Sequence, residues 1–170
     1  MAKDRDRDRG ERESDGLEDR LIKVRRSSTT VKGGRCFTFN ALVVIGDGKG
    51  RVAFGYGKAN EVPPAVEKAT KEARELVRRR RPVHLRGDTI PHRIVGRYGS
   101  SRVILVPAGA GTGVKAGASV RAVLEVAGVR NILTKVHGST NPINLIKATL
   151  DGLENLRSRE AVARLRGVAL

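Results

Sequence analysis

The sequence has few of the residues that build covalently linked or metal-bound sites. Cys36 is the only cysteine among 170 residues, so an internal disulfide and a cysteine-based zinc site are both excluded, and a reducing compartment is expected. No apolar run approaches the ~20 residues that a bilayer-crossing helix needs. The N-terminus has no apolar signal-peptide core, and its many acids argue against an organelle transit peptide. We therefore expect a soluble, cytoplasmic protein.

Aromatic residues are also scarce. They make up 3% of the chain, and Trp is absent. A protein that binds nucleic acid mainly by stacking on bases would carry more of them. The hydrophobic cores must therefore be built from Val, Ile, Leu and Ala, and any nucleic-acid partner is expected to be recognised through its backbone and shape.

Positive charge, by contrast, is abundant. The chain has 34 Lys and Arg against 18 Asp and Glu, a net charge of +16. Residues 1–16 carry a net charge of −1, residues 17–81 carry +9 and residues 82–170 carry +8. The excess belongs to the body of the chain and not to a basic tail, so we expect a polyanionic partner such as a structured RNA or DNA.

The first 81 residues divide into a charged extension and a small α+β unit. Residues 1–16 alternate in charge and have one Ala as their only apolar residue after Met1, so we expect this extension to be disordered. Over 17–81 the pattern predicts the order β-β-β-α. The predicted elements are a short strand around 21–24, a polar loop over 27–34, a strand over 37–45, a hairpin turn over 46–50, a strand over 52–56, and a helix that Asn60 caps, with Pro63 and Pro64 in its first turn.

The two longer strands differ in their faces. In the strand over 37–45, alternating apolar residues predict one buried face. In the strand over 52–56 and just beyond, Ala53, Gly55 and Gly57 share a face. These residues are small enough for a helix or an RNA backbone to approach closely.

Residues 82–170 predict a second α/β unit. Segments around 83–97 and 101–106 have strand-like patterns, and a glycine-rich loop spans 109–117. The remaining predicted elements are a helix over 118–127 that Gly128 ends, a strand over 132–136, a helix that Thr140 or Asn141 caps with Pro142 near its first position, and a basic helix within 157–170.

Basic side chains are expected to gather at one sheet edge and one helix end. The run from Arg78 to Arg81 ends the predicted helix with no matching acids to neutralise it. For this arginine run we favour contact with RNA phosphates over a solvated helix end. For residues 47–50 we favour a tight hairpin over a phosphate-binding loop. The predicted RNA-binding residues are Arg25, Arg26, Lys32, Gly33, Gly34, Arg35, Lys49, Arg51, Lys58, Arg78, Arg79, Arg80 and Arg81.

The glycine-rich loop follows a strand and precedes a helix, which is the context of a nucleotide-binding loop. The P-loop pattern fails because Val114 follows Gly113, where that pattern requires Lys. The stretch 111–116 matches the looser dinucleotide fingerprint, but Asn131 stands where an acid is required. A flexible loop at a macromolecular contact is the favoured interpretation. A nucleotide-dependent enzyme is the alternative, and it depends on this loop alone.

No other motif points to chemistry. His84, His92 and His137 lack the spacing of metal ligands and have few acids near them in sequence. No His near Cys36 in sequence could activate its thiol. We therefore predict no catalytic residues, no metal site and no cofactor.

Several long stretches resemble bacterial small-subunit ribosomal protein five. The main one runs from Val31 to Pro63 and reads VKGGRCFTFNALVVIGDGKGRVAFGYGKANEVP. Three more lie in the second half: RAVLEVAG at 121–128, GSTNPIN at 138–144 and ATLDGLE at 148–154. The resemblance covers about residues 17–167.

This resemblance implies a fold and a set of partners. The N-terminal domain would be similar to a double-stranded-RNA-binding fold, and the C-terminal domain would contain a βαβ crossover of the unusual left-handed kind. The family binds small-subunit (16S) ribosomal RNA and acts in subunit assembly, decoding accuracy and the messenger RNA entry channel. It contacts ribosomal proteins four and eight, and the contact with protein four would here involve Gly111, Gly113, Lys115 and Arg121.

The chain departs from the family pattern at Ala108, Gly109 and Ala110, where the family commonly has an acid. Residues 1–16 lie outside the family core, and no role follows for them. The alternative to a ribosomal protein, within the class of RNA-binding proteins, is a free-standing double-stranded-RNA binder. Such a protein would need only the first unit.

Overall fold

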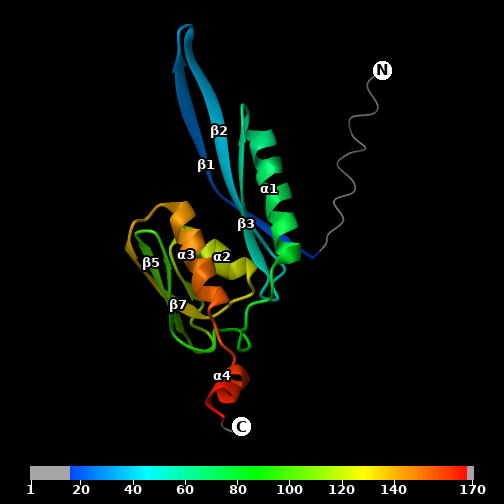
Figure 1. Cartoon of the computed structure of the whole chain (residues 1–170), viewed down its shortest axis with the longest axis vertical. Coiled ribbons are helices and arrows are strands. Elements are labelled where there is room, and N and C mark those ends of the chain that lie inside the picture. The colour runs from blue at the N-terminus through cyan, green and yellow to red at the C-terminus, as the bar shows by residue number, and fades with distance from the viewer. Residues whose placement is uncertain (1–15, 168–170) are drawn as a thin grey trace.

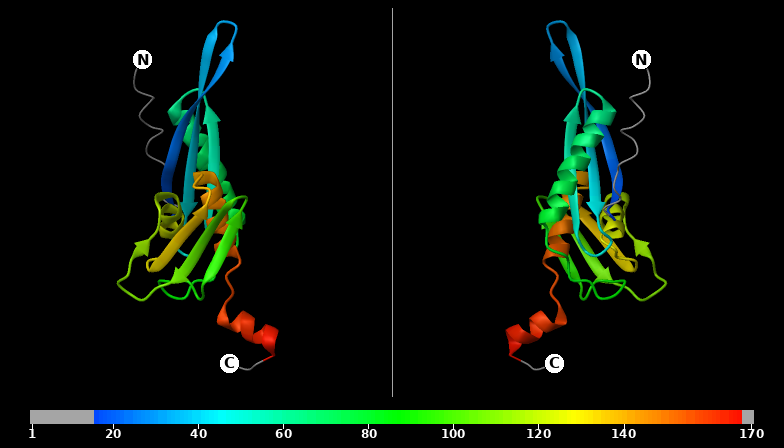
Figure 2. Two further views of the ribbon diagram at one scale, coloured as in Figure 1. Left: turned by 90° about the vertical axis from the view of Figure 1, so that its left-hand side faces the viewer. Right: turned by 90° about the vertical axis from the view of Figure 1, so that its right-hand side faces the viewer.

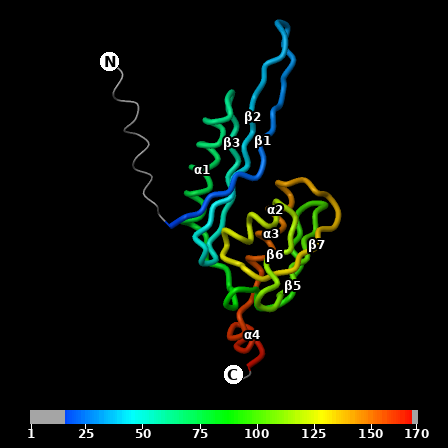
Figure 3. Tube along the Cα trace, turned by 180° about the vertical axis from the view of Figure 1, so that it is seen from behind, coloured from blue at the N-terminus to red at the C-terminus, as the bar shows by residue number. Residues whose placement is uncertain are grey.

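The computed structural model describes residues 16–167 of the chain, which form two sheets, three helices packed against them and a last helix that lies apart from both sheets (Figures 1 and 3). The expected extension over 1–16 thus lies, apart from Gly16, outside the described residues. The α+β class is confirmed by two antiparallel-rich sheets with helices packed on them. Among residues 16–167, none of the helices combines the length and apolar character that a membrane crossing needs.

The first sheet is antiparallel and has the order β1-β2-β3. Its strands are β1 (Glu18–Val31), β2 (Gly34–Gly46) and β3 (Val52–Ala59), and helix α1 (Val62–Arg79) covers one face. The sequence predicted one buried face for β2, but both of its faces are buried. Val43 faces α1, and its neighbours Leu42 and Val44 are equally buried on the opposite face, where the second unit packs.

Two glycines of β3 bring its backbone against that of α1. A Cβ on Gly55 would overlap the carbonyl oxygen of Ala69, and a Cβ on Gly57 would overlap that of Ala65. The helix also has small residues at this contact: Ala65, Ala69 and Ala73 are fully buried. Of the two partners expected for this small-residue face, the helix is therefore the one that occupies it.

The first hairpin is much longer than predicted. The polar residues over 27–31, expected in a loop, continue β1, which pairs with β2 in register from Thr30 opposite Arg35 back to Glu18 opposite Gly46. A bulge interrupts the pairing between Leu21 and Lys23. Backbone hydrogen bonds form a strand regardless of side-chain polarity, so a sequence without an apolar alternation still extends the ladder.

The ends of α1 also correct the sequence predictions. Glu61 is the N-cap residue, and no side chain caps this helix, so Asn60 does not have the predicted role. Pro63 and Pro64 do lie in the first turn. At the other end Arg79 is the last helical residue, and Arg80 is already extended with φ −81° and ψ 145°.

The second unit contains a four-stranded sheet with the order β4-β5-β7-β6. Its strands are β4 (Ile94–Tyr98), β5 (Ser101–Pro107), β6 (Val114–Lys115) and β7 (Ile132–Gly138), and its helices are α2 (Ala118–Val126), α3 (Pro142–Glu154) and α4 (Arg159–Arg166). Residues 83–93, part of a segment expected to be strand-like, contain only an isolated bridge between Arg86 and Thr89. Strands β6 and β7 are parallel and flank α2, which gives the expected βαβ unit. Its left-handed crossover stays a prediction.

The main hydrophobic core crosses between the two units. Leu42, Val44 and Val52 from the first sheet belong to the same buried cluster as Val123 of α2 and Ile146 of α3. A second, smaller cluster lies between the first sheet and α1. The boundary predicted after residue 81 stays a prediction, and packing is continuous across it.

Candidate nucleic-acid interface

The most distinctive surface is the outer end of the first hairpin. Strand β3 pairs with β2 only from Phe39 to Gly46, so residues 27–38 form a two-stranded arm that projects beyond the sheet and α1 (Figures 1 and 2). No acidic residue occurs from Arg20 to Gly46. All side chains from Thr29 to Phe37 are exposed. The arm is therefore an exposed ribbon with only positive charge.

Both faces of the hairpin carry positive charge at the base of the arm. Arg25 of β1, Asn40 of β2 and Lys58 of β3 lie side by side in one cross-strand row on the face away from α1. Arg26 belongs to the opposite face, where its guanidinium carbon lies 4.5 Å from the centroid of the Phe37 ring. Stacking of this kind holds a guanidinium in place without neutralising it.

The predicted residues of the first loop form the tip of this arm. Lys32 and Gly33 make the turn, Gly34 has a φ of 136° that favours glycine, and Arg35 lies opposite Thr30. Nearer the base, the hydroxyl oxygens of Ser27 and Thr38 are 2.8 Å apart and join the two strands. The structure thus brings six predicted residues together in the arm and at its base: Arg25, Arg26, Lys32, Gly33, Gly34 and Arg35.

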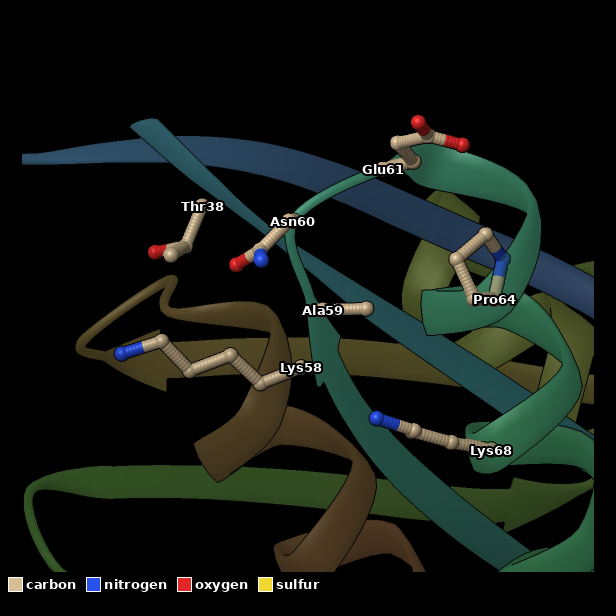
Figure 4. Close-up of a pocket in the computed structure, with 7 residues that line it drawn as sticks. All are labelled: Thr38, Lys58, Ala59, Asn60, Glu61, Pro64 and Lys68. Carbon is tan, nitrogen blue, oxygen red and sulfur yellow. The ribbon is translucent and has the colours of Figure 1, made fainter. Parts of the chain in front are cut away.

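A groove of about 420 Å³ lies where the arm meets the start of α1 (Figure 4). Lys58 of β3 and Lys68 of α1 both line it, and the side chains of Thr38 and Asn60 lie at its upper end. Lys68 is not among the predicted RNA-binding residues, because local sequence could not show that it lines the same groove as Lys58.

The turn between β2 and β3 is the hairpin that the sequence predicted. Oδ1 of Asp47 accepts hydrogen bonds from the backbone N–H groups of Lys49, at 2.8 Å, and Arg51, at 2.9 Å. The N–H groups of Gly48 and Gly50 donate to carbonyls at the end of α2. These amides are occupied within the protein, so the turn is no phosphate-binding loop, and only the exposed side chains of Lys49 and Arg51 face outward.

The arginine run is partly neutralised, contrary to the prediction of no matching acids. Arg79 pairs with Glu75 of the same helix at 2.5 Å. Arg80 pairs with Glu154 of α3. The second acid lies far away in sequence and approaches only through the fold. Arg81 follows the end of α1 and is exposed.

The predicted RNA-binding residues therefore fall in two zones. Lys49 and Arg51 lie close to the arginine run, because the N–H of Val83 donates to the carbonyl of Gly50 at 3.0 Å. The arm lies at the other end of the sheet. Strand β2 has 13 residues, so about 40 Å separates the tip of the arm from the turn, at about 3.3 Å per residue. These two zones suit a long, regular polyanion better than a small ligand.

The glycine-rich loop is held by the residue that stands in place of an acid. Oδ1 of Asn131 accepts a hydrogen bond from the N–H of Gly113 at 3.1 Å. Arg121 of α2 donates from Nη2 to the carbonyl of Val114 at 3.0 Å. Gly111 and Gly113 have φ values of 85° and 72°, and a Cβ at either would meet open space. The N–H of Gly113 is thus not available to a phosphate, and Gly111, Gly113, Lys115 and Arg121 form one exposed to half-buried corner.

Within residues 16–167, no group of three or more His, Cys, Asp or Glu side chains is placed to hold a metal ion. Cys36 is exposed on the arm as a free thiol.

Comparison with known proteins is consistent across the whole chain. Residues 17–79 match the family model described as ribosomal protein S5, N-terminal domain, and residues 96–166 match ribosomal protein S5, C-terminal domain. The small ribosomal subunit protein uS5 of Rhodopirellula baltica is 51% identical over 99% of this chain and 96% of its own length. The uS5 protein of Psychromonas ingrahamii is 53% identical over 94% of each chain.

Proposed function

Because the chain belongs to the ribosomal protein S5 family, we propose that its basic arm binds the backbone of small-subunit ribosomal RNA. The family consists of structural, non-enzymatic components of the small subunit of the cytoplasmic ribosome, and this chain is one of them. The observation that carries the proposal is the projecting arm over 27–38, which has exposed basic side chains and no acid.

The mechanism is phosphate neutralisation by a preformed surface. Backbone pairing fixes the arm before the RNA arrives, and its arginine and lysine side chains displace counterions from the RNA. A double-stranded-RNA-binding domain spans about 16 base pairs and reads shape more than sequence. The two basic zones, separated along β2, support contact with an RNA helix at more than one point.

The finer roles of the family are proposed on the same basis. We place subunit assembly, decoding accuracy and a position beside the messenger RNA entry channel among the functions of this chain. Contact with ribosomal protein four is assigned to the corner formed by Gly111, Gly113, Lys115 and Arg121. The support for this assignment is the open space around both glycines and the exposure of Lys115. Ribosomal protein eight is proposed as a second neighbour.

The RNA-binding proposal is tested on the tip of the arm. Replacing Lys32 and Arg35 with Ala should weaken binding to small-subunit ribosomal RNA and reduce the salt dependence of that binding, because each lost phosphate contact lowers the slope of log K against log[salt] by about 1. Filter binding across a salt series measures both. The matched control is Arg102→Ala with Lys135→Ala, which removes two exposed cations from the second sheet.

An unchanged salt slope in the Lys32 and Arg35 variant would contradict the assignment of the arm. If the control variant lost as much RNA affinity, binding would depend on the net charge of the chain and not on the arm.

A further inference from the structure

A small pocket lies where the start of α3 comes close to the first sheet, on the face of that sheet that points away from α1 (Figures 1 and 3). Its volume is about 110 Å³. A single water molecule needs roughly 10–15 Å³, and pockets for drug-sized ligands begin at about 300 Å³. The pocket is therefore large enough for one ring of a bigger molecule and too small for a whole ligand of that size.

Two cross-strand rows of the first sheet form one wall of this pocket. Lys23, Leu42 and Tyr56 lie opposite one another in the first row, and Arg25 and Asn40 lie opposite each other in the second. Neighbours in a row point to the same face of a sheet. The wall thus has two cations on β1, an amide and an aliphatic side chain on β2, and an aromatic ring on β3.

The amide of Asn40 has a hydrogen-bonding group without a partner. Its Oδ1 is buried and, within residues 16–167, accepts no hydrogen bond. Buried side-chain polar atoms are almost always hydrogen-bonded, so an exception needs an explanation. Because Asn40 lines the pocket, a molecule that enters can supply the donor. The phosphodiester of a nucleic acid offers acceptors alone, whereas its bases and ribose hydroxyls also donate.

Tyr56 offers a ring for stacking in a chain that has few aromatic residues. Its side chain is 43% exposed. Pro142 and Ile143, at the start of α3, line the pocket from the side of the second unit. A planar base fits between an aromatic ring and an apolar wall, and RNA-binding proteins hold unpaired bases by stacking of this kind.

The mouth of the pocket is positively charged. Lys23 and Arg25 are exposed, and within residues 16–167 neither forms an ion pair with a carboxylate. Helix α3 begins here without a side-chain cap, so the N–H groups of its first turn add partial positive charge. Among the described residues, none that line the pocket is acidic. Phosphates that flank a bound base would meet these charges.

We propose that this pocket binds the base of one unpaired nucleotide of the small-subunit ribosomal RNA. Tyr56 stacks on the base, Asn40 hydrogen-bonds to its edge, and Lys23 and Arg25 contact the neighbouring phosphates. The proposal rests on the RNA binding proposed above. It adds a contact that recognises a base, whereas the arm contacts the RNA backbone.

A carboxylate of a neighbouring protein fits the pocket less well. It would pair with Lys23 and Arg25, but an ionised carboxylate has no donor for Oδ1 of Asn40 and no ring to stack on Tyr56. An unpaired nucleotide supplies the negative charge, the donor and the ring together.

Filter binding of the full chain to small-subunit ribosomal RNA across a salt series tests the pocket. Asn40→Leu and Tyr56→Leu should each weaken binding about tenfold, the scale of a lost base contact. The slope of log K against log[salt] should stay at the parental value, because neither side chain contacts a phosphate. Circular dichroism should show an unchanged or higher melting temperature for Asn40→Leu, which replaces an unpartnered amide by an apolar group of similar size.

Tyr98→Leu is the matched control. Tyr98 is also 43% exposed, but it lies on β4 outside the pocket. This variant should bind the RNA with parental affinity. An equal loss of affinity in the control would overturn the proposal, and so would a reduced salt slope in the two pocket variants, because the pocket would then contact phosphate.

The outcomes separate this proposal from the function proposed above. If the Lys32 and Arg35 variant loses affinity and salt slope while both pocket variants bind like the parent, RNA binding by the arm stands and the base pocket is overturned. A pocket that holds only water gives that result. Parental RNA affinity with poor incorporation into small subunits would also overturn it, because the occupant would then be a protein.

Ultraviolet crosslinking of the intact small subunit, followed by mass spectrometry of the chain, provides a second readout. Tyr56 should carry a single-nucleotide adduct, and the mass of the adduct identifies the base. Tyr98 is the internal control and should carry none. Adducts on the arm without one on Tyr56, or equal adducts on both tyrosines, would contradict the assignment of the pocket.

Discussion

Gly55 and Gly57 show how single residues set the spacing of the first unit. Each places the β3 backbone directly against a carbonyl of α1, at a distance that a side chain would prevent. The sequence indicated that this face is suited to close approach, since Ala53, Gly55 and Gly57 recur at period two. It could not distinguish a helix from RNA, because both present a backbone to the same small residues.

Replacing Gly57 with Ala should lower the free energy of unfolding by about 3 kcal/mol, because the new methyl group overlaps the backbone of Ala65 and α1 must move away. Urea titration measures this loss. Gly33→Ala is the control, since a Cβ there meets nothing within 4 Å, and its effect should be about 0.5 kcal/mol or less. Equal stability of the two variants would contradict the close packing of β3 on α1.

At the scale of elements, the projecting arm is the feature that the sequence concealed. Its residues are polar and carry no apolar alternation, so the pattern predicted a loop. Backbone hydrogen bonds nevertheless pair these residues as two strands. The core elements were predictable for the opposite reason: in β2, β3, α1, α2 and α3, apolar residues recur in the sequence at the period of the structure that forms.

Partners that come from distant parts of the chain were equally hidden. Glu154 neutralises Arg80 across 74 positions of sequence, and Asn131 binds Gly113 across 18. No local pattern records such pairs. The candidate site was therefore predictable as a set of basic residues, but its division into an arm and a lower zone was not.

Removing the arm should separate binding from stability. Replacing residues 27–38 with Asn-Gly joins Arg26 to Phe39, which already lie opposite each other, through a turn that hairpins favour. Because the deleted side chains are mostly exposed, the melting temperature followed by circular dichroism should change little. Affinity for small-subunit ribosomal RNA should fall at least as far as in the Lys32 and Arg35 variant. A large loss of thermal stability would show that the arm is part of the folding core.

At the scale of the whole molecule, one core connects the two units. Leu42, Val44 and Val52 complete a cluster whose other members come mostly from residues 90–156. Family models match the two halves separately, and the sequence likewise predicted two domains. The apolar residues on the second face of β2 indicate that the two units pack against each other, because a strand exposed on one face would have polar residues there.

The full chain should therefore unfold in a single cooperative transition, and the isolated segment 17–81 should melt at a lower temperature, because it exposes Leu42, Val44 and Val52 to water. Calorimetry of the two proteins measures this difference. Two separate transitions in the full chain, with the segment melting like one of them, would contradict the shared core.

The central claim is that this chain is an RNA-bound component of the small ribosomal subunit. Sucrose-gradient sedimentation of a cell lysate at moderate and high salt, with detection of this chain, tests it most directly. We predict co-migration with small subunits that survives moderate salt. Migration as a free small protein at every salt concentration would contradict the claim and favour a free-standing RNA binder.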